Sequence, residues 1–173
     1  MTIPARDEVI RRILEREGGV ADVGDGKGVT RFGQTPAWLE QFDLPIPTNE
    51  AEAADNYAAW LAITGLDAVV GDEADVLADF VIDFAVHSGH PPAIAALQIA
   101  LGHLKVDRVI GPKTRAAVDA LDQVHGRRKA VAVSVFAEEL RYQGRAITSN
   151  PAKHAKQAHG WANRNADKLL QLR

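Results

Sequence analysis

The chain has 173 residues, of which 46% are hydrophobic and 25% are charged, enough apolar content for one packed domain with or without a small appendage. It contains no cysteine, which excludes disulfides and thiolate metal sites. No apolar run approaches the roughly 20 residues of a membrane span, and the charged first segment lacks a signal-peptide core. We therefore expect synthesis in the cytoplasm, no integral membrane segment and a fold stabilised by packing.

The formal net charge of −3 conceals an uneven distribution of charge along the chain. Residues 1–90 carry 6 Lys and Arg against 17 Asp and Glu, whereas residues 91–173 carry 14 against 6. A basic half is typical of a surface that contacts an anionic polymer such as nucleic acid, lipopolysaccharide or cell wall. The alternative is that the two halves attract each other across a shared interface.

The first predicted helix covers residues 4–17. Its apolar side chains recur at helical spacing, at Val9, Ile10, Ile13 and Leu14. Continuing that stripe places Glu17 on the inward side, directly before Gly18-Gly19. Burial and the negative end of the helix dipole would both favour a protonated carboxyl group there, as a general acid requires. The alternative is a last-turn glutamate that bends into solvent, with Gly18 as an ordinary C-terminal cap.

The segment after this helix, residues 18–34, is dense in glycine and aspartate and predicts turns with a small irregular β-ribbon. Thr35-Pro36 then predicts the cap and first residue of a short helix that ends at Phe42. Thr48 and Asn49 cap the next predicted helix. Residues 73–88 are the most apolar helix and the predicted centre of the core.

Further helices are predicted over residues 93–101, 113–121 and 124–147, the last being the longest, and a final helix follows Pro151. The sequence shows no repeat, low-complexity tract or obvious linker. The predicted fold class is therefore all-α, in one compact helical domain with a small β-ribbon at about residues 18–34.

Three residues around the ribbon form a pattern. Glu17, Asp25 and Thr30 have the spacing E-x7-D-x4-T, which resembles the E-x8-D-x5-T arrangement of phage-type lysozymes. The closer resemblance is to glycoside hydrolase family 108, the bacterial and phage N-acetylmuramidases. Their signature is an apolar helix ending in E-G-G, followed by D-x-G-G-x-T-x-(aromatic)-G. Glu17-Gly18-Gly19 and residues 25–33 (DGKGVTRFG) occupy these places.

Four more segments resemble that family in the same order along the chain, so the likeness covers most of it. They are residues 83–89 (DFAVHSG), 96–102 (ALQIALG), 110–114 (IGPKT) and 160–164 (GWANR). The departures are a ribbon about one residue short, Gln34 in place of an isoleucine, His87 in place of an asparagine, and Asp107-Arg108 in place of Asp-Gly.

The resemblance implies a lysozyme-like fold and cleavage of the β-1,4 bond between N-acetylmuramic acid and N-acetylglucosamine in peptidoglycan. In that scheme Glu17 protonates the glycosidic oxygen. Asp25 stabilises the oxocarbenium-like transition state or orients the attacking water, and Thr30 positions a water on the far face of the sugar. Asp25 has an alternative role as a turn former, and Thr30 as an ordinary strand residue.

The candidate substrate contacts are Phe32, Trp38, Asp83 and His87. The two aromatic rings flank the ribbon and would stack on sugars, although a place in the core is the alternative. Asp83 and His87 lie four residues apart on one helix face, either lining the cleft or making a buried structural hydrogen bond. Residues 127–129, a basic cluster, indicate anionic contacts or a solvated face.

The resemblance also implies two parts, a lysozyme-like catalytic part at 1–90 and a helical C-terminal part at 91–173 that packs on it and is a possible peptidoglycan-binding region. We expect bacterial peptidoglycan as partner, no nucleic acid and a monomer, with access to the wall after holin-mediated release. No cofactor is expected, and the six scattered histidines, with no HExxH, predict no metal site. The rival functions are a lytic transglycosylase and a non-catalytic peptidoglycan-binding or virion structural protein.

Overall fold

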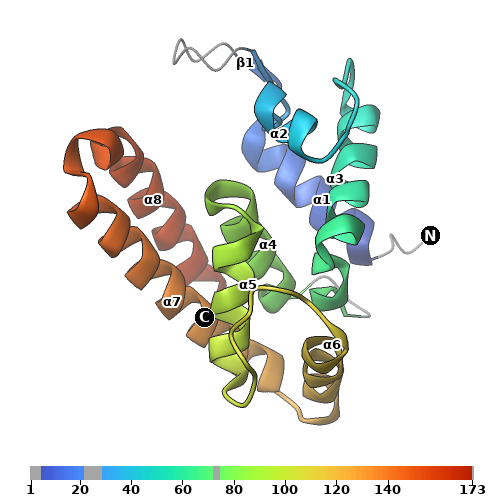
Figure 1. Cartoon of the computed structure of the whole chain (residues 1–173), viewed down its shortest axis with the longest axis vertical. Coiled ribbons are helices and arrows are strands. Elements are labelled where there is room, and N and C mark those ends of the chain that lie inside the picture. Colours follow the sequence, from blue (N-terminus) through green and yellow to red (C-terminus); the bar gives the residue numbers. More distant parts are fainter. Residues whose placement is uncertain (1–4, 22–28, 72–74, 173) are drawn as a thin grey trace. The chain divides into compact units, whose positions relative to one another are not determined.

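The computed structural model describes residues 5–21, 29–71 and 75–172. Helices make up most of these residues and the strands are a single short pair, which confirms the predicted helical class with a small β-ribbon (Figure 1). Contacts within the chain group it into two compact units, Met1–Ala74 and Asp75–Arg173. The functional division predicted between residues 90 and 91 stays a prediction.

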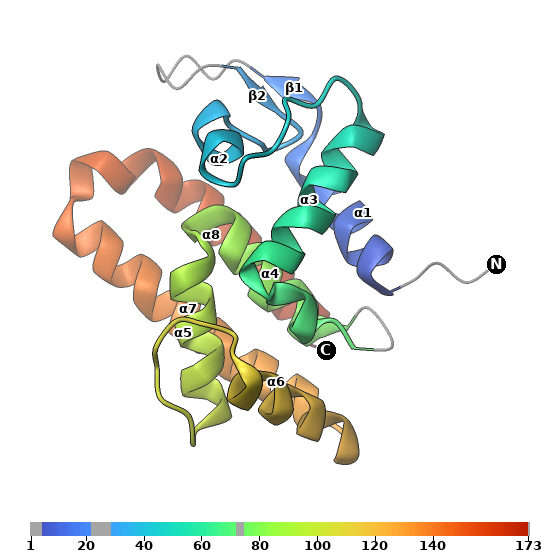
Figure 2. The ribbon, with the colours of Figure 1, turned by 45° about the vertical axis from the view of Figure 1, so that its right-hand side comes forward.

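The first unit holds the ribbon and the helices on either side of it (Figure 2). Its elements are α1 (Ala5–Glu17), β1 (Val20–Ala21), β2 (Thr30–Arg31), α2 (Pro36–Gln41), α3 (Glu50–Thr64) and the 3₁₀ helix η1 (Leu66–Val69). α1 packs against α3 through the predicted apolar stripe, whose four members are all buried. α3 contributes a buried face of Ala53, Tyr57, Trp60 and Leu61.

Both predicted caps of the first unit are present. The side chain of Thr35 accepts a hydrogen bond from the backbone N–H of Trp38, with Pro36 in the first turn of α2. The side chain of Asn49 accepts one from the backbone N–H of Glu52 at the start of α3. These bonds satisfy donors that a helix start otherwise leaves unpaired, which fixes where both helices begin.

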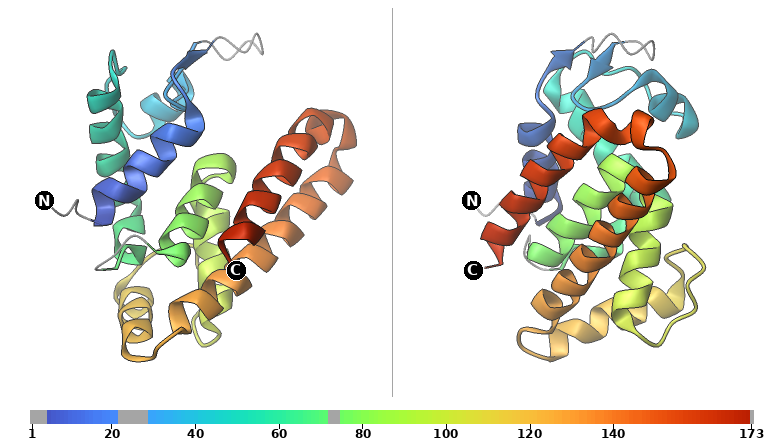
Figure 3. Two further views of the ribbon diagram at one scale, coloured as in Figure 1. Left: turned by 180° about the vertical axis from the view of Figure 1, so that it is seen from behind. Right: turned by 90° about the vertical axis from the view of Figure 1, so that its left-hand side faces the viewer.

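The second unit is helical throughout its described residues. Its elements are α4 (Val76–Ser88), α5 (His90–Leu101), α6 (Pro112–Asp119), the 3₁₀ helix η2 (Ala120–Gln123), α7 (Arg127–Ser149) and α8 (Pro151–Gln171). α4 is the predicted core helix, and α5 and α7 pack against it. α7 and α8 run side by side as an antiparallel hairpin (Figure 3).

Two helix starts differ from the sequence expectation. α5 begins at His90, so the Pro91-Pro92 pair lies in its first turn, where a missing N–H is harmless, and does not precede the helix. α7 begins at Arg127, after Gly126 with a φ of 74°.

No helix among the residues that the structure describes is both long enough and apolar enough to cross a membrane.

Candidate active site

Glu17 is the last residue of α1. The helix ends there because Gly18 adopts a φ of 71° and its backbone N–H closes the last turn on the carbonyl of Leu14, at 3.1 Å. The Glu17 side chain is half-buried. This exposure lies between the two alternatives, a buried glutamate on the apolar side of the helix and a glutamate that bends into solvent. Gly18 does act as a helix cap, and the carboxylate-bearing side chain is still partly withdrawn from solvent.

A tight turn at Phe32 and Gly33 follows the second strand. Their φ values are 51° and 80°, and two consecutive positive φ angles are the mark of a type I′ turn. Arg31 and Gln34 close the turn by exchanging two backbone hydrogen bonds, at 3.1 and 2.8 Å. The N–H of Phe32 also donates to the carbonyl of Gly19, at 2.9 Å. The turn is therefore tied to the chain just after Glu17.

Gly33 lies directly against the Glu17 side chain. A Cβ at position 33 would come within 2.7 Å of the Glu17 Cγ and within 2.7 Å of the Tyr57 hydroxyl oxygen. Both distances are far below van der Waals contact, so only glycine allows the turn to approach this closely. Gly33 thus sets how near the ribbon lies to the end of α1.

Tyr57 forms the other side of this contact. It is 2% exposed, and its hydroxyl donates to the carbonyl of Phe32, at 3.0 Å. Burial raises the pKa of Tyr57, and the negative charge of Glu17 raises it further. Tyr57 therefore stays a neutral hydrogen-bond donor that supports the turn.

A buried polar pair holds the ribbon on α3. The Gln34 side chain, 1% exposed, donates to the carbonyl of Ala53 at 2.9 Å and accepts from the Asn56 side chain at 2.8 Å. Asn56 also donates to the carbonyl of Pro45, at 2.8 Å. Every one of these groups would be costly to bury unpaired. Gln34, which departs from the family pattern, is therefore matched by Asn56.

Trp38 belongs to an aromatic cluster in the same unit. Its ring centroid lies 5.4 Å from that of Phe42, 5.6 Å from Tyr57 and 5.8 Å from Trp60. Such tilted pairs at these separations stabilise a cluster beyond the area they bury. Trp38 is half-buried, so part of its surface packs in the cluster and part faces outward.

Thr30 lies in β2, where it pairs with Ala21 of the antiparallel β1, and it is half-buried. Asp25 lies outside the described residues. The structure thus brings Glu17 together with the Phe32-Gly33 turn and Tyr57, places Trp38 against Tyr57, and leaves the predicted roles of Asp25 and Thr30 as predictions.

Asp83 and His87 lie in the second unit, on α4. The expected proximity is present: the His87 Nδ1 is 3.6 Å from the Asp83 Oδ1 and 2.8 Å from the Asp83 backbone carbonyl oxygen. Asp83 also takes part in a buried ionic cluster. The ammonium of Lys168 in α8 lies 2.7 Å from the Asp83 Oδ2 and 2.6 Å from the Glu139 Oε2 in α7. The predicted substrate contact at these two residues stays a prediction.

This cluster combines one cation with two carboxylates, all three nearly inaccessible to solvent. Burial alone would raise the pKa of Asp83, but the Lys168 ammonium and then His87 hold it below its ordinary value. Burial raises the pKa of Glu139, against the opposing effect of Lys168 and with a smaller contribution from the Asp83 charge. Lys168 is thus the ammonium that both buried carboxylates share.

Sequence reasoning missed Gly33, Tyr57 and Lys168. Gly33 was visible as part of the ribbon motif, but its closeness to Glu17 depends on how the ribbon folds back. Lys168 is an unremarkable basic residue in a basic segment of the sequence. Within the described parts of both units, no group of three or more His, Asp and Glu side chains is arranged to hold a metal ion.

No family model and no curated protein sequence matches this chain. Among solved structures, its fold is similar to that of SagA from Brucella abortus. The TM-score is 0.67 at 23% sequence identity, and the similarity covers 96% of this chain and 92% of that one. At this level of identity the likeness defines a shared helical fold, and it does not carry residue roles from one protein to the other.

Proposed function

We propose that this protein is a peptidoglycan hydrolase of the N-acetylmuramidase type, with Glu17 as the general acid. The observation that carries the proposal is the position of Glu17, which is half-buried at the end of α1 and held against the glycine of the ribbon turn. The motif resemblance supplies the reaction. The SagA-like fold supports the proposal only at the level of architecture.

The surroundings of Glu17 suit an acid that must deliver a proton to a glycosidic oxygen. The Glu17 side chain is half-buried, and Gly33 of the ribbon turn lies against it. The strained, hydrogen-bonded turn limits how far that side chain can move. A positioned carboxyl group on a half-buried side chain is an arrangement that general acid catalysis uses.

In the proposed mechanism Asp25 and Thr30 hold the attacking water on the far side of the sugar, which gives inversion at the anomeric carbon. Phe32 and Trp38 would contact the glycan beside the ribbon. The substrate is bacterial peptidoglycan, reached from the cytoplasm after holin-mediated release. No cofactor takes part in this scheme.

The test is digestion of purified peptidoglycan by the wild-type chain and by Glu17→Gln, with mass spectrometry of the products. We expect reducing muramic acid ends from the wild type and a loss of about 10²–10⁴-fold in rate for Glu17→Gln, the range of general acid–base catalysis. The matched control is Glu15→Gln, which removes an exposed carboxylate from the same helix and should keep wild-type activity.

Each other outcome would indicate a different function for this chain. Anhydromuramic ends from the wild type would indicate a lytic transglycosylase. No cleavage by the wild type would indicate a non-catalytic wall-binding or structural protein. Retention of more than a few per cent of activity in Glu17→Gln would remove Glu17 as the acid.

A further inference from the structure

A cavity of about 390 Å³ lies within the second unit, and none of the residues proposed for catalysis lines it. This volume falls in the range of small-ligand sites, roughly 300–1,000 Å³. Its apolar wall comes from α4 and α5, with Phe84 and Ala96 buried and the Pro91-Pro92 pair beside them. Tyr142 of α7 also lines it, with its ring 5.4 Å from that of Phe84.

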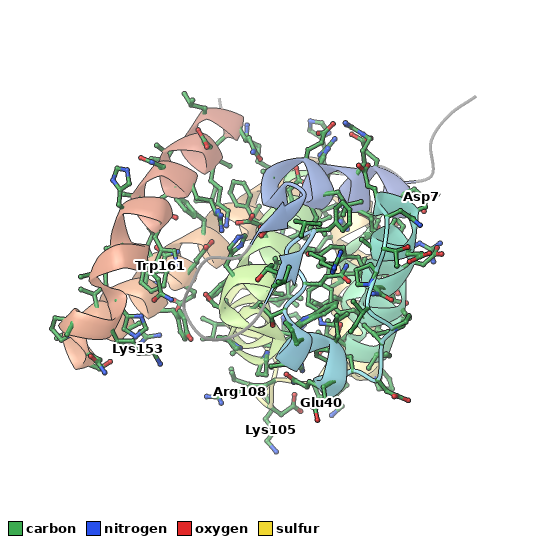
Figure 4. All side chains as sticks on the ribbon, turned by 90° about the horizontal axis from the view of Figure 1, so that it is seen from above. Asp7, Glu40, Lys105, Arg108, Lys153 and Trp161 are labelled. Atoms are coloured by element: carbon green, nitrogen blue, oxygen red, sulfur yellow. The ribbon has the colours of Figure 1, made fainter. Side chains whose placement is uncertain are left out.

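Two arginines line the same cavity from different elements. Arg145 comes from α7, and Arg108 from the loop between α5 and α6, where Figure 4 labels it near Lys105. Both are exposed, and neither guanidinium has an ion pair within the described part of the chain. The one carboxylate that lines the cavity, Glu138, is already paired with Arg141. The cavity is therefore apolar at its wall and positively charged at its rim.

The backbone of Arg108 is strained. Its φ of 66° is in the left-handed region, which favours glycine. The loop holds this conformation firmly: the Gln98 side chain accepts from the Arg108 N–H at 2.9 Å and donates to Asp107 and to the Val109 carbonyl. The arginine carries a backbone cost that a glycine would not, and such strain is found where a side chain has a task.

We propose that this cavity binds a short anionic peptide with small apolar side chains, its carboxylates on Arg108 and Arg145. Guanidinium groups bind carboxylates through paired hydrogen bonds, and the proline and alanine wall would accept methyl-sized side chains. The stem peptides of peptidoglycan have this chemistry. The choice of stem peptide rests on the proposed function, and the site would then hold the wall through its peptide and not through its glycan.

The probe is a synthetic stem tetrapeptide without sugar, titrated into the full-length chain by calorimetry. We expect saturable binding to the wild type and to Glu17→Gln alike. The same peptide with its carboxylates amidated should bind at least about tenfold more weakly, since the charged hydrogen bonds are lost. Equal affinity for the two peptides would overturn the proposal, as would no binding of the free peptide.

The decisive variant is Arg108→Gly, because a structural role and a binding role predict opposite results. Glycine relieves the positive φ, so the Tm should be equal to or above that of the wild type, while peptide affinity falls at least about tenfold. Arg145→Ala should also weaken binding. Lys153→Ala, which removes an exposed cation from α8 that does not line the cavity, should not.

Unchanged affinity in Arg108→Gly, or an equal loss in Lys153→Ala, would show that the cavity is not the site. The two proposals fail separately. If the chain binds the peptide but does not cleave peptidoglycan, the hydrolase proposal is wrong and the peptide site stands. If it cleaves peptidoglycan but does not bind the peptide, the peptide site is wrong and the hydrolase proposal stands.

Discussion

Replacing Gly33 by alanine tests whether the ribbon turn positions Glu17. An L-residue at a φ of 80° costs about 1–2 kcal/mol, and forcing a methyl group into a filled space costs about 1–3 kcal/mol more. The added Cβ would press on the Glu17 side chain and on the Tyr57 hydroxyl, both at 2.7 Å. We therefore expect a total loss of about 2–5 kcal/mol in the free energy of unfolding. A displacement of the acid by about 1 Å would lower the hydrolysis rate about 10²-fold.

Gly18→Ala is the matched control for this substitution. Gly18 also has a positive φ, 71°, and also neighbours Glu17, but a Cβ there meets nothing within 4 Å. Gly18→Ala should therefore lose only the about 1–2 kcal/mol of unfolding free energy that an L-residue at positive φ costs, and it should keep most of the activity. Urea denaturation followed by circular dichroism gives the stabilities, and a wall-lysis assay gives the rates. If Gly33→Ala is no less stable and no less active than Gly18→Ala, the contact with Glu17 does not position the acid.

Two further predictions concern charge. Lys168→Met should cost about 3–5 kcal/mol at pH 7 because it removes the ammonium that is paired with two buried carboxylates. Lys153→Met, exposed on the same helix, should cost little. Without the ammonium the pKa values of Asp83 and Glu139 both rise, so both carboxylates become neutral as the pH falls from 7 to 4. The loss in the free energy of unfolding caused by Lys168→Met should therefore shrink over this range. A series of urea-unfolding measurements in which that loss is constant with pH would contradict this. Wall lysis should weaken as ionic strength rises above the physiological range, and Arg127→Ala with Lys129→Ala should flatten that response; an unchanged salt curve would leave these two residues as a solvated face.

Arg128 differs from Arg127 and Lys129 in its surroundings, and it is therefore not changed in the salt experiment. Its guanidinium is paired with Asp75 and Asp122 and is mostly shielded from solvent. The sequence shows a run of three cations at the start of α7, and only their local environment distinguishes them. Arg127 and Lys129 are exposed, so only these two remain candidates for contact with an anionic wall.

The elements that sequence reasoning predicted correctly are those set by local chemistry. The stripe of α1, the caps at Thr35 and Asn49 and the apolar run of α4 depend on residues a few positions apart. The helix start at Pro91-Pro92 was misjudged for a local reason too. Proline both ends a helix and opens one, and the pattern alone does not say where the first turn lies.

The contacts that sequence reasoning did not predict join residues far apart in the chain. Glu139 and Lys168 are 29 positions apart, and Tyr57 meets the carbonyl of a residue 25 positions away. Nothing in the composition of α8 distinguishes the buried Lys168 from its exposed basic neighbours. Its burial follows from which face of α8 packs on α7, and that is decided by tertiary packing.

Backbone strain connects the two sites proposed for this chain. Among the described residues, three non-glycine residues have positive φ: Phe32, Asp43 and Arg108. Aspartate tolerates this conformation through local hydrogen bonds, so Asp43 needs no further reason. Phe32 and Arg108 have no such tolerance. Each is held by a hydrogen bond to a buried side chain: the Phe32 carbonyl accepts from Tyr57, and the Arg108 N–H donates to Gln98. Both strained residues lie at the places where the chain would meet the wall, beside Glu17 and beside the cationic cavity.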